Sequence, residues 1–107
     1  MPSYADTPKP PYYAVIFTSQ RTDGDNGYAD MSERMNALAS EQPGYLGMES
    51  ARAEIGITVS YWTDLDSIKN WKANLEHQEA QTSGREKWYR DYKIRISKVE
   101  RDYDFIK

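Results

Sequence analysis

The sequence predicts a single α+β domain with the element order strand, helix, strand, strand, helix, strand. Short runs rich in β-branched and aromatic residues, separated by loop-forming residues, indicate the strands. Two longer segments repeat their apolar residues every three or four positions, which indicates helices. The 107 residues leave room for one core. An antiparallel sheet with this element order is a ferredoxin-like split unit.

The first half of the chain supplies an arm, a strand and a helix. Residues 1–11 hold four of the five prolines, which predicts an extended arm that is disordered or laid across a neighbour. Residues 12–18, YYAVIFT, are apolar on both alternating faces, as in a central strand covered on two sides. The next apolar stripe predicts a helix that ends before Pro43: Tyr28, Met31, Met35 and Leu38.

The second half supplies a hairpin, a helix and a long strand. Residues 45–52 and 57–62 are predicted strands joined through 53–56, where glycine supplies unusual backbone angles. Thr63 is the expected cap of the second helix, with an acidic residue three positions on. Its apolar side is expected to include Leu65, Ile68 and Leu75, with Trp71 at the border.

Residues 88–105 are long enough for two ordinary strands. Their apolar alternation switches parity near Ser97 and Lys98, which predicts a bulge or a change of sheet there. We expect the end of this strand to pair with a second copy of the chain, so that two sheets form a dimeric α/β barrel. The domain is thus expected to cover residues 12–107, after the arm of residues 1–11.

Composition limits the possible functions. A net charge of −3 argues against a general nucleic-acid binder. The absence of cysteine excludes disulfides and thiol catalysis. No apolar run approaches the ~18 residues of a membrane span, and the N-terminus lacks the pattern of a signal peptide. The cytoplasm is therefore the expected compartment, with no membrane partner.

The stretch from Tyr61 to Tyr92 holds all three tryptophans and the only histidine. So many indoles in a short span indicate either a dense core or an aromatic-walled pocket. On an unbroken helix, His77 points towards water. If the helix kinks near Asn74, a new stripe forms and faces a cavity: His77, Gln81, Gly84 and Trp88. The kink is favoured because Gly84 would otherwise weaken a continuous helix.

Other candidate residues also have two interpretations. Trp71 either packs in the core or lines a pocket. Tyr13 and Phe17 share one strand face, which is either a cavity wall or ordinary core. Arg95 lies on the alternate strand face from the neighbouring isoleucines, where it either holds an acidic group of a ligand or forms a salt bridge in a dimer.

Five segments resemble domains of the antibiotic-biosynthesis-monooxygenase type, and in particular a small bacterial branch that includes haem-degrading monooxygenases. They are YYAVIFTSQRT, QPGYLGMESAR, ITVSYW, IKNWKANLEHQEAQ and GREKWYRDYKIRISKVERDYDF. The resemblance covers about Tyr12 to Phe105. It implies a dimeric α/β barrel with a ligand cavity between the sheet and helices of each subunit. Cofactor-free members oxidise electron-rich phenols to quinones near a helix tryptophan, which Trp71 matches, and haem-degrading members use a helix histidine, for which His77 is the candidate.

The resulting hypothesis is a monooxygenase acting on a planar aromatic molecule, either a phenol or quinol or haem. It has no cofactor of its own, unless haem binds as substrate or cofactor. Trp71 and His77 are the expected catalytic residues, and His77 is an iron ligand only if haem binds. The expected ligand-binding residues are Gln81, Trp88, Tyr13, Phe17 and Arg95. The alternatives are a non-catalytic homodimer that binds a small molecule in the same cavity, and a purely structural dimer.

Overall fold

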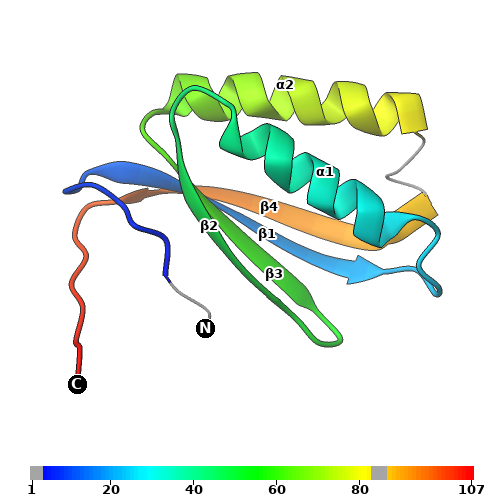
Figure 1. Ribbon diagram of the computed structural model, residues 1–107, viewed down its shortest axis with the longest axis horizontal. Coiled ribbons are helices and arrows are strands. Elements are labelled where there is room, and N and C mark those ends of the chain that lie inside the picture. The colour runs from blue at the N-terminus through cyan, green and yellow to red at the C-terminus, as the bar shows by residue number, and fades with distance from the viewer. Residues whose placement is uncertain (1–3, 83–86) are drawn as a thin grey trace.

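A computed structural model describes residues 4–82 and 87–107. One antiparallel sheet with strand order β2-β3-β1-β4 carries both helices on the same face (Figure 1). The elements are β1 (Tyr12–Arg21), α1 (Tyr28–Ser40), β2 (Tyr45–Arg52), β3 (Gly56–Trp62), α2 (Leu65–Thr82) and β4 (Tyr89–Val99). The predicted βαββαβ order and the ferredoxin-like α+β fold are confirmed. None of the described helices is both long and apolar enough to cross a membrane.

The core lies between both helices and the end of the sheet where β1 begins, with Ala39 of α1 among its buried residues. Trp62 of β3 is fully buried, and Trp71 of α2 stacks on it with 6.2 Å between ring centroids. Tyr13 and Val15 of the central strand β1 pack against this pair. The helix-covered face of β1 is therefore apolar at this end, as the sequence pattern predicts.

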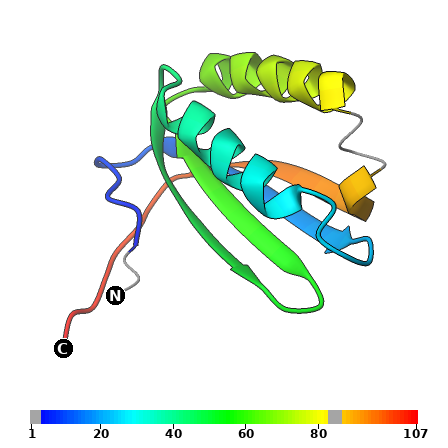
Figure 2. The ribbon, with the colours of Figure 1, turned by 45° about the vertical axis from the view of Figure 1, so that its right-hand side comes forward.

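Helix α2 is a single uninterrupted helix, so the predicted kink near Asn74 is wrong (Figure 2). Its sequence from Leu65 to Thr82 contains no glycine or proline that would break the hydrogen-bond ladder. The predicted apolar side is also shifted, because Leu65 is 53% exposed while Ile68 and Trp71 are buried.

The cap of α2 differs from the expected one as well. Asp64 Oδ1 accepts a hydrogen bond of 2.7 Å from the backbone N–H of Ser67, so Asp64 caps the helix in place of Thr63. This backbone hydrogen bond holds the pKa of the Asp64 carboxyl below its ordinary value. Thr63 instead donates to the Asp64 carboxylate, which helps to fix the capping group.

Strand β4 ends at Val99, and its pairing with β1 is regular from Ile94 to Val99, so the bulge predicted as one alternative near Ser97 and Lys98 is wrong. The register shift in this pairing lies at the opposite end, between Gln20 and Arg21 of β1. Residues 100–107, called here the C-terminal tail, continue without helix or strand. Three of its side chains are 84% exposed or more: Tyr103, Phe105 and Ile106.

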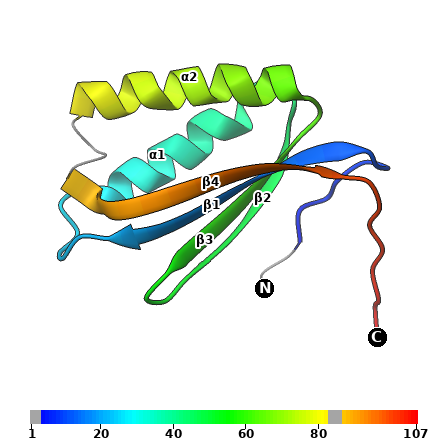
Figure 3. The same ribbon diagram turned by 180° about the vertical axis from the view of Figure 1, so that it is seen from behind.

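The sheet face without helices carries residues 4–11, called here the N-terminal arm, and the C-terminal tail leaves from the same end of the molecule (Figure 3). Glu49 of β2 joins the arm to this open face. Its Oε2 accepts a 2.8 Å hydrogen bond from the backbone N–H of Ala5, and its Oε1 accepts one of 2.7 Å from the Tyr61 hydroxyl. Burial, together with the hydrogen bond to Glu49, raises the pKa of Tyr61 to about 12.

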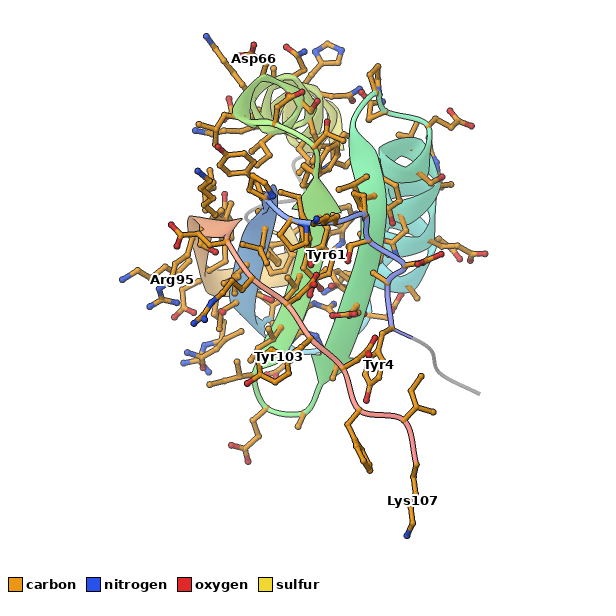
Figure 4. The ribbon with its side chains drawn as sticks, turned by 90° about the vertical axis from the view of Figure 1, so that its left-hand side faces the viewer. Tyr4, Tyr61, Asp66, Arg95, Tyr103 and Lys107 are labelled. Carbon is orange, nitrogen blue, oxygen red and sulfur yellow. The ribbon has the colours of Figure 1, made fainter. Side chains whose placement is uncertain are left out.

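Hydrogen bonds of Tyr12 connect both ends of the chain to β1. The hydroxyl of Tyr12 accepts a hydrogen bond of 3.1 Å from Thr7 and donates to the carboxylate of Asp102. The described part of the arm thus lies across the chain's own sheet. Figure 4 shows the labelled Tyr4, Tyr61 and Tyr103 at this end of the molecule.

Candidate functional site

Small polar residues occupy the helix-covered face of the sheet where further apolar side chains would be expected. Paired residues in an antiparallel sheet share a face, so Ser60 lies on the same face as its partner Val15, and Thr58 on the same face as Phe17. Ser60 is 7% exposed and accepts a 2.9 Å hydrogen bond from the Trp62 indole. Because these side chains are short, they leave space beneath the helices.

That space opens into a groove of about 330 Å³ between α1 and the β2–β3 hairpin. Its volume lies at the lower end of the range for small-molecule sites, ~300–1,000 Å³. The side chains that reach it from α1 are Tyr28, Ser32 and Asn36, and those from the helix-covered face of the hairpin are Met48, Ser50, Arg52 and Thr58. The groove is thus lined by hydroxyl and amide groups, one thioether, one phenol and one guanidinium, together with Ala51, Gly56 and Ile57.

Arg52 is the charged residue of the groove. Its Nη2 donates a 2.5 Å hydrogen bond to Oγ of Ser19, a β1 residue that is 1% exposed. The guanidinium lies directly over Gly56, where a Cβ atom would collide with it. Gly56 does not have a positive φ, so the prediction that it supplies an unusual turn conformation is wrong. Its role is to leave room for Arg52.

An aromatic cluster adjoins the groove through Tyr28. The Tyr28 ring makes edge contacts with Trp88 at 6.1 Å and Tyr89 at 5.8 Å between centroids. Phe17 contacts Tyr89 and Tyr92 in the same cluster. Trp88 is 6% exposed and its indole donates to the carbonyl of Asn26, so it also holds the loop before α1.

The structure divides the predicted site residues into separate groups. Phe17 and Trp88 meet in this aromatic cluster, whereas Tyr13 and Trp71 belong to the core around Trp62. Neither pair lines the groove, and Trp71 has the surroundings of a packing residue.

The remaining predicted residues lie elsewhere. His77 is exposed on α2. Arg95 is paired with Ile16 and points away from both helices, on the opposite face of the sheet from Trp71 (Figure 4). The backbone of Gln81 lies in the last turn of α2, and its side chain, like all of Gly84, lies outside the described residues.

Sequence reasoning missed the groove because its signal is weak. Ser32 and Asn36 are four apart on α1 and so share a side of the helix, but polar residues on a helix are ordinarily solvent-facing. Only the alternation of Ser50, Thr58 and Ser60 with apolar neighbours, combined with the observed pairing, places these residues beneath the helices. In the described part of the chain, no group of three His, Cys, Asp or Glu side chains is positioned to hold a metal ion.

Comparison with solved structures identifies the class of fold. SnoaB from Streptomyces nogalater, a cofactor-independent oxygenase, superposes with a TM-score of 0.71 at 13% identity, covering 87% of this chain and 97% of SnoaB. PA3566 from Pseudomonas aeruginosa gives 0.65 at 16% identity, over 89% and 98% of the two chains. A Nitrosomonas europaea protein provisionally assigned as an antibiotic biosynthesis monooxygenase gives 0.64 at 9% identity, over 86% and 92%. The protein therefore has the antibiotic-biosynthesis-monooxygenase fold.

A sequence relative defines the family more narrowly. The chain is 52% identical over 97 residues to YqjZ of Bacillus subtilis strain 168, an uncharacterised protein, covering 89% of this chain and 85% of YqjZ. No established family model matches the sequence. The chain belongs to the YqjZ family.

Proposed function

We propose that the protein is a cofactor-independent monooxygenase that oxidises a small, electron-rich phenol in the groove between α1 and the β2–β3 hairpin. The observation that carries this proposal is a polar groove of about 330 Å³ on the helix-covered face of a monooxygenase-like sheet. Hydroxyl and amide groups on its walls would orient the hydroxyl groups of a phenol, while Met48 and the Tyr28 ring would contact its ring.

The reaction needs no electron donor other than the substrate. One atom of dioxygen becomes the oxygen of a new quinone carbonyl group on the ring. The other leaves as water, with one hydrogen from the phenol hydroxyl and one from the attacked ring carbon. The four electrons that reduce dioxygen all come from the substrate, so an ionised phenol is the reactive species. The protein then has to bind, orient and ionise the phenol, and to keep the reaction away from bulk water.

The described residues do not fit haem as well as they fit a phenol. The only histidine, His77, is exposed on α2 and does not line the groove. An axial ligand has to line the cavity that holds the macrocycle, and His77 is not among the residues of the groove. We therefore propose the phenol and assign no step to His77 or Trp71.

Oxygen consumption with a panel of hydroxynaphthalenes and hydroxyanthracenes tests the proposal. Ser32→Leu fills the groove from α1, and Ser40→Leu is the matched control, because Ser40 is exposed on the same helix and does not line the groove. We expect turnover in the parent and in Ser40→Leu, and its loss in Ser32→Leu. Binding without oxygen uptake would indicate a non-catalytic carrier instead. A haemin Soret shift that disappears in His77→Ala would favour the haem alternative.

We also propose that the protein is a homodimer in which the C-terminal tail pairs with a second copy. The outer edge of β4 has no partner strand within the described chain. Ile94 and Ile96 of this edge strand are 42% and 50% exposed, and the tail exposes further large apolar residues. Exposed apolar groups beside an unpaired strand edge are characteristic of a surface covered by another chain.

Sedimentation velocity tests this assembly. The full chain should sediment as a dimer, and a chain that ends at Val99 should be monomeric or aggregated. Lys107→Ser is the control, since it alters the last residue without removing an apolar side chain. A full chain that stays monomeric at high micromolar concentration contradicts the assembly but leaves the groove and its chemistry intact.

A further inference from the structure

Arg52 is held in place but not neutralised. Ser19 accepts its 2.5 Å hydrogen bond through a neutral hydroxyl, and among the side chains that the structure describes, those of residues 4–77 and 87–107, no carboxylate lies within 4 Å of the guanidinium. Arg52 belongs to the lining of the groove, where it can present its remaining N–H groups. A guanidinium fixed beside a groove with no acidic partner is suited to an anionic ligand.

The neighbouring cation adds to the positive charge at this end of the groove. The Arg21 guanidinium carbon lies 3.5 Å from the centroid of the Tyr28 ring, and Arg52 approaches the same ring to 6.0 Å. Arg21 donates to the backbone carbonyls of Trp88, Gly24 and Asp25, which hold it against the loop. Neutral carbonyl groups do not cancel the positive charge of Arg21, so two guanidinium groups lie near the Tyr28 ring.

We propose that the groove binds a planar aromatic anion, with Arg52 as the contact for its negatively charged oxygen. This inference rests on the proposed function for the identity of the site, and it names the ionised form of the ligand as the bound one. Ser19 is a positioning residue, because it contacts Arg52 and fixes the direction of the guanidinium. Gly56 provides the space that lets the two side chains meet.

The negative oxygen has two chemical sources, an aromatic carboxylate or a phenolate. Calorimetric titration without oxygen separates them with three probes: 2-naphthoate, 2-naphthol and neutral 2-methylnaphthalene. We expect 2-naphthoate to bind in preference to 2-methylnaphthalene, with an affinity that falls as salt is added. If 2-naphthol binds as the phenolate, titrations in buffers of different ionisation heat will show release of a proton. Equal binding of the neutral probe overturns the proposal.

Three variants test the role of Arg52. Arg52→Gln removes the charge and should weaken binding of 2-naphthoate about tenfold or more, as for loss of a charge-assisted hydrogen bond at a partly exposed site. Arg95→Gln removes the same charge from the opposite face of the sheet and should leave binding unchanged. Arg52→Lys keeps the charge but loses the planar fork, so its affinity should lie between that of the parent and that of Arg52→Gln.

Gly56→Ala offers a test that leaves the net charge intact. The three atoms nearest to the added methyl group all belong to the end of the flexible Arg52 side chain, which can move aside, so the fold should tolerate the change. We expect weaker binding of 2-naphthoate, with an unchanged circular dichroism spectrum. Unaltered affinity in both Arg52→Gln and Gly56→Ala contradicts the inference. Arg52-dependent binding without oxygen uptake from any phenol keeps the anion site and removes the oxygenase.

Discussion

Trp71 is either a packing residue of the core or a catalytic residue, and replacing it tests which of the two roles it has. The indole is 9% exposed and stacks on Trp62, which is fully buried. The sequence resemblance places a helix tryptophan near the substrate, whereas the structure surrounds Trp71 with core residues. We therefore expect replacement of Trp71 to change stability and not the chemistry of the groove.

The expected loss of stability follows from the buried area. A buried aromatic side chain removes about 150–250 Å² from water, and at about 25 cal/mol per Å² this corresponds to about 4 to 6 kcal/mol. Measured costs of replacing buried Trp or Phe by Ala are about 3–5 kcal/mol. Because small domains are stable by only ~5–15 kcal/mol, Trp71→Ala risks unfolding the chain. Trp71→Phe keeps most of the ring and should cost about 1–3 kcal/mol.

Thermal unfolding and oxygen uptake are the two assays. Each kcal/mol should lower Tm by roughly 4–8 °C for a domain of this size. Leu65→Ala is the control on the same helix, since its side chain is 53% exposed and should contribute much less. If Trp71→Phe retains the stability of the parent but loses binding or turnover, Trp71 faces the ligand and its assignment to the core is refuted.

Two further predictions concern the sheet and its loops. The pKa of Tyr61 is raised to about 12 from an unfolded value of about 10, so its contribution to stability is full below pH ~10 and is lost as the pH rises towards 12. Urea unfolding at several alkaline pH values should show that the free energy of unfolding falls in the parent and in the control Tyr103→Phe. The fall should be shallower in Tyr61→Phe. If the free energy of unfolding falls equally steeply with pH in all three proteins, the assignment to Tyr61 is wrong. Gly44 and Gly27 both have positive φ, but a Cβ at Gly44 collides with Ser67 whereas one at Gly27 meets nothing within 4 Å. Gly44→Ala should therefore lower the free energy of unfolding by more than Gly27→Ala, for which about 1 kcal/mol is expected, and the reverse order would show that α2 can move aside.

The fold was accessible from the sequence because its signals are local. The apolar run in β1, the helical spacing from Tyr28 to Leu38 and the hairpin between β2 and β3 each depend on neighbours in the chain. Two local predictions are wrong because residue type alone does not decide the backbone at a glycine. The kink in α2 is predicted from Gly84, which lies outside the described residues, and the turn role of Gly56 is predicted without the contact that Arg52 makes with it.

The candidate site is only partly predictable from the sequence because it depends on contacts between residues distant in the chain. The aromatic rings of Phe17 and Trp88 mark them as candidates in the sequence, and the structure places them in one cluster that reaches the groove through Tyr28. Arg52 could not be selected, since an arginine at the end of a predicted strand is ordinarily a solvated residue. Its position at the groove depends on the hydrogen bond to Ser19, which is 33 residues away in the chain.

The polar residues beneath the helices connect the fold to the proposed chemistry. The helix-covered face of a sheet is ordinarily filled with large apolar side chains, and Tyr13, Val15 and Trp62 follow this rule at one end. At the other end Phe17 packs in the aromatic cluster, but Ser19 and Thr58 replace large apolar residues beside it, and this is the end where the groove forms. A smaller core costs stability, so the replacement is expected where space and hydrogen-bonding groups serve a ligand. The division of one sheet face into a packed end and a polar end therefore supports a site beside Arg52 in preference to one beside Trp71.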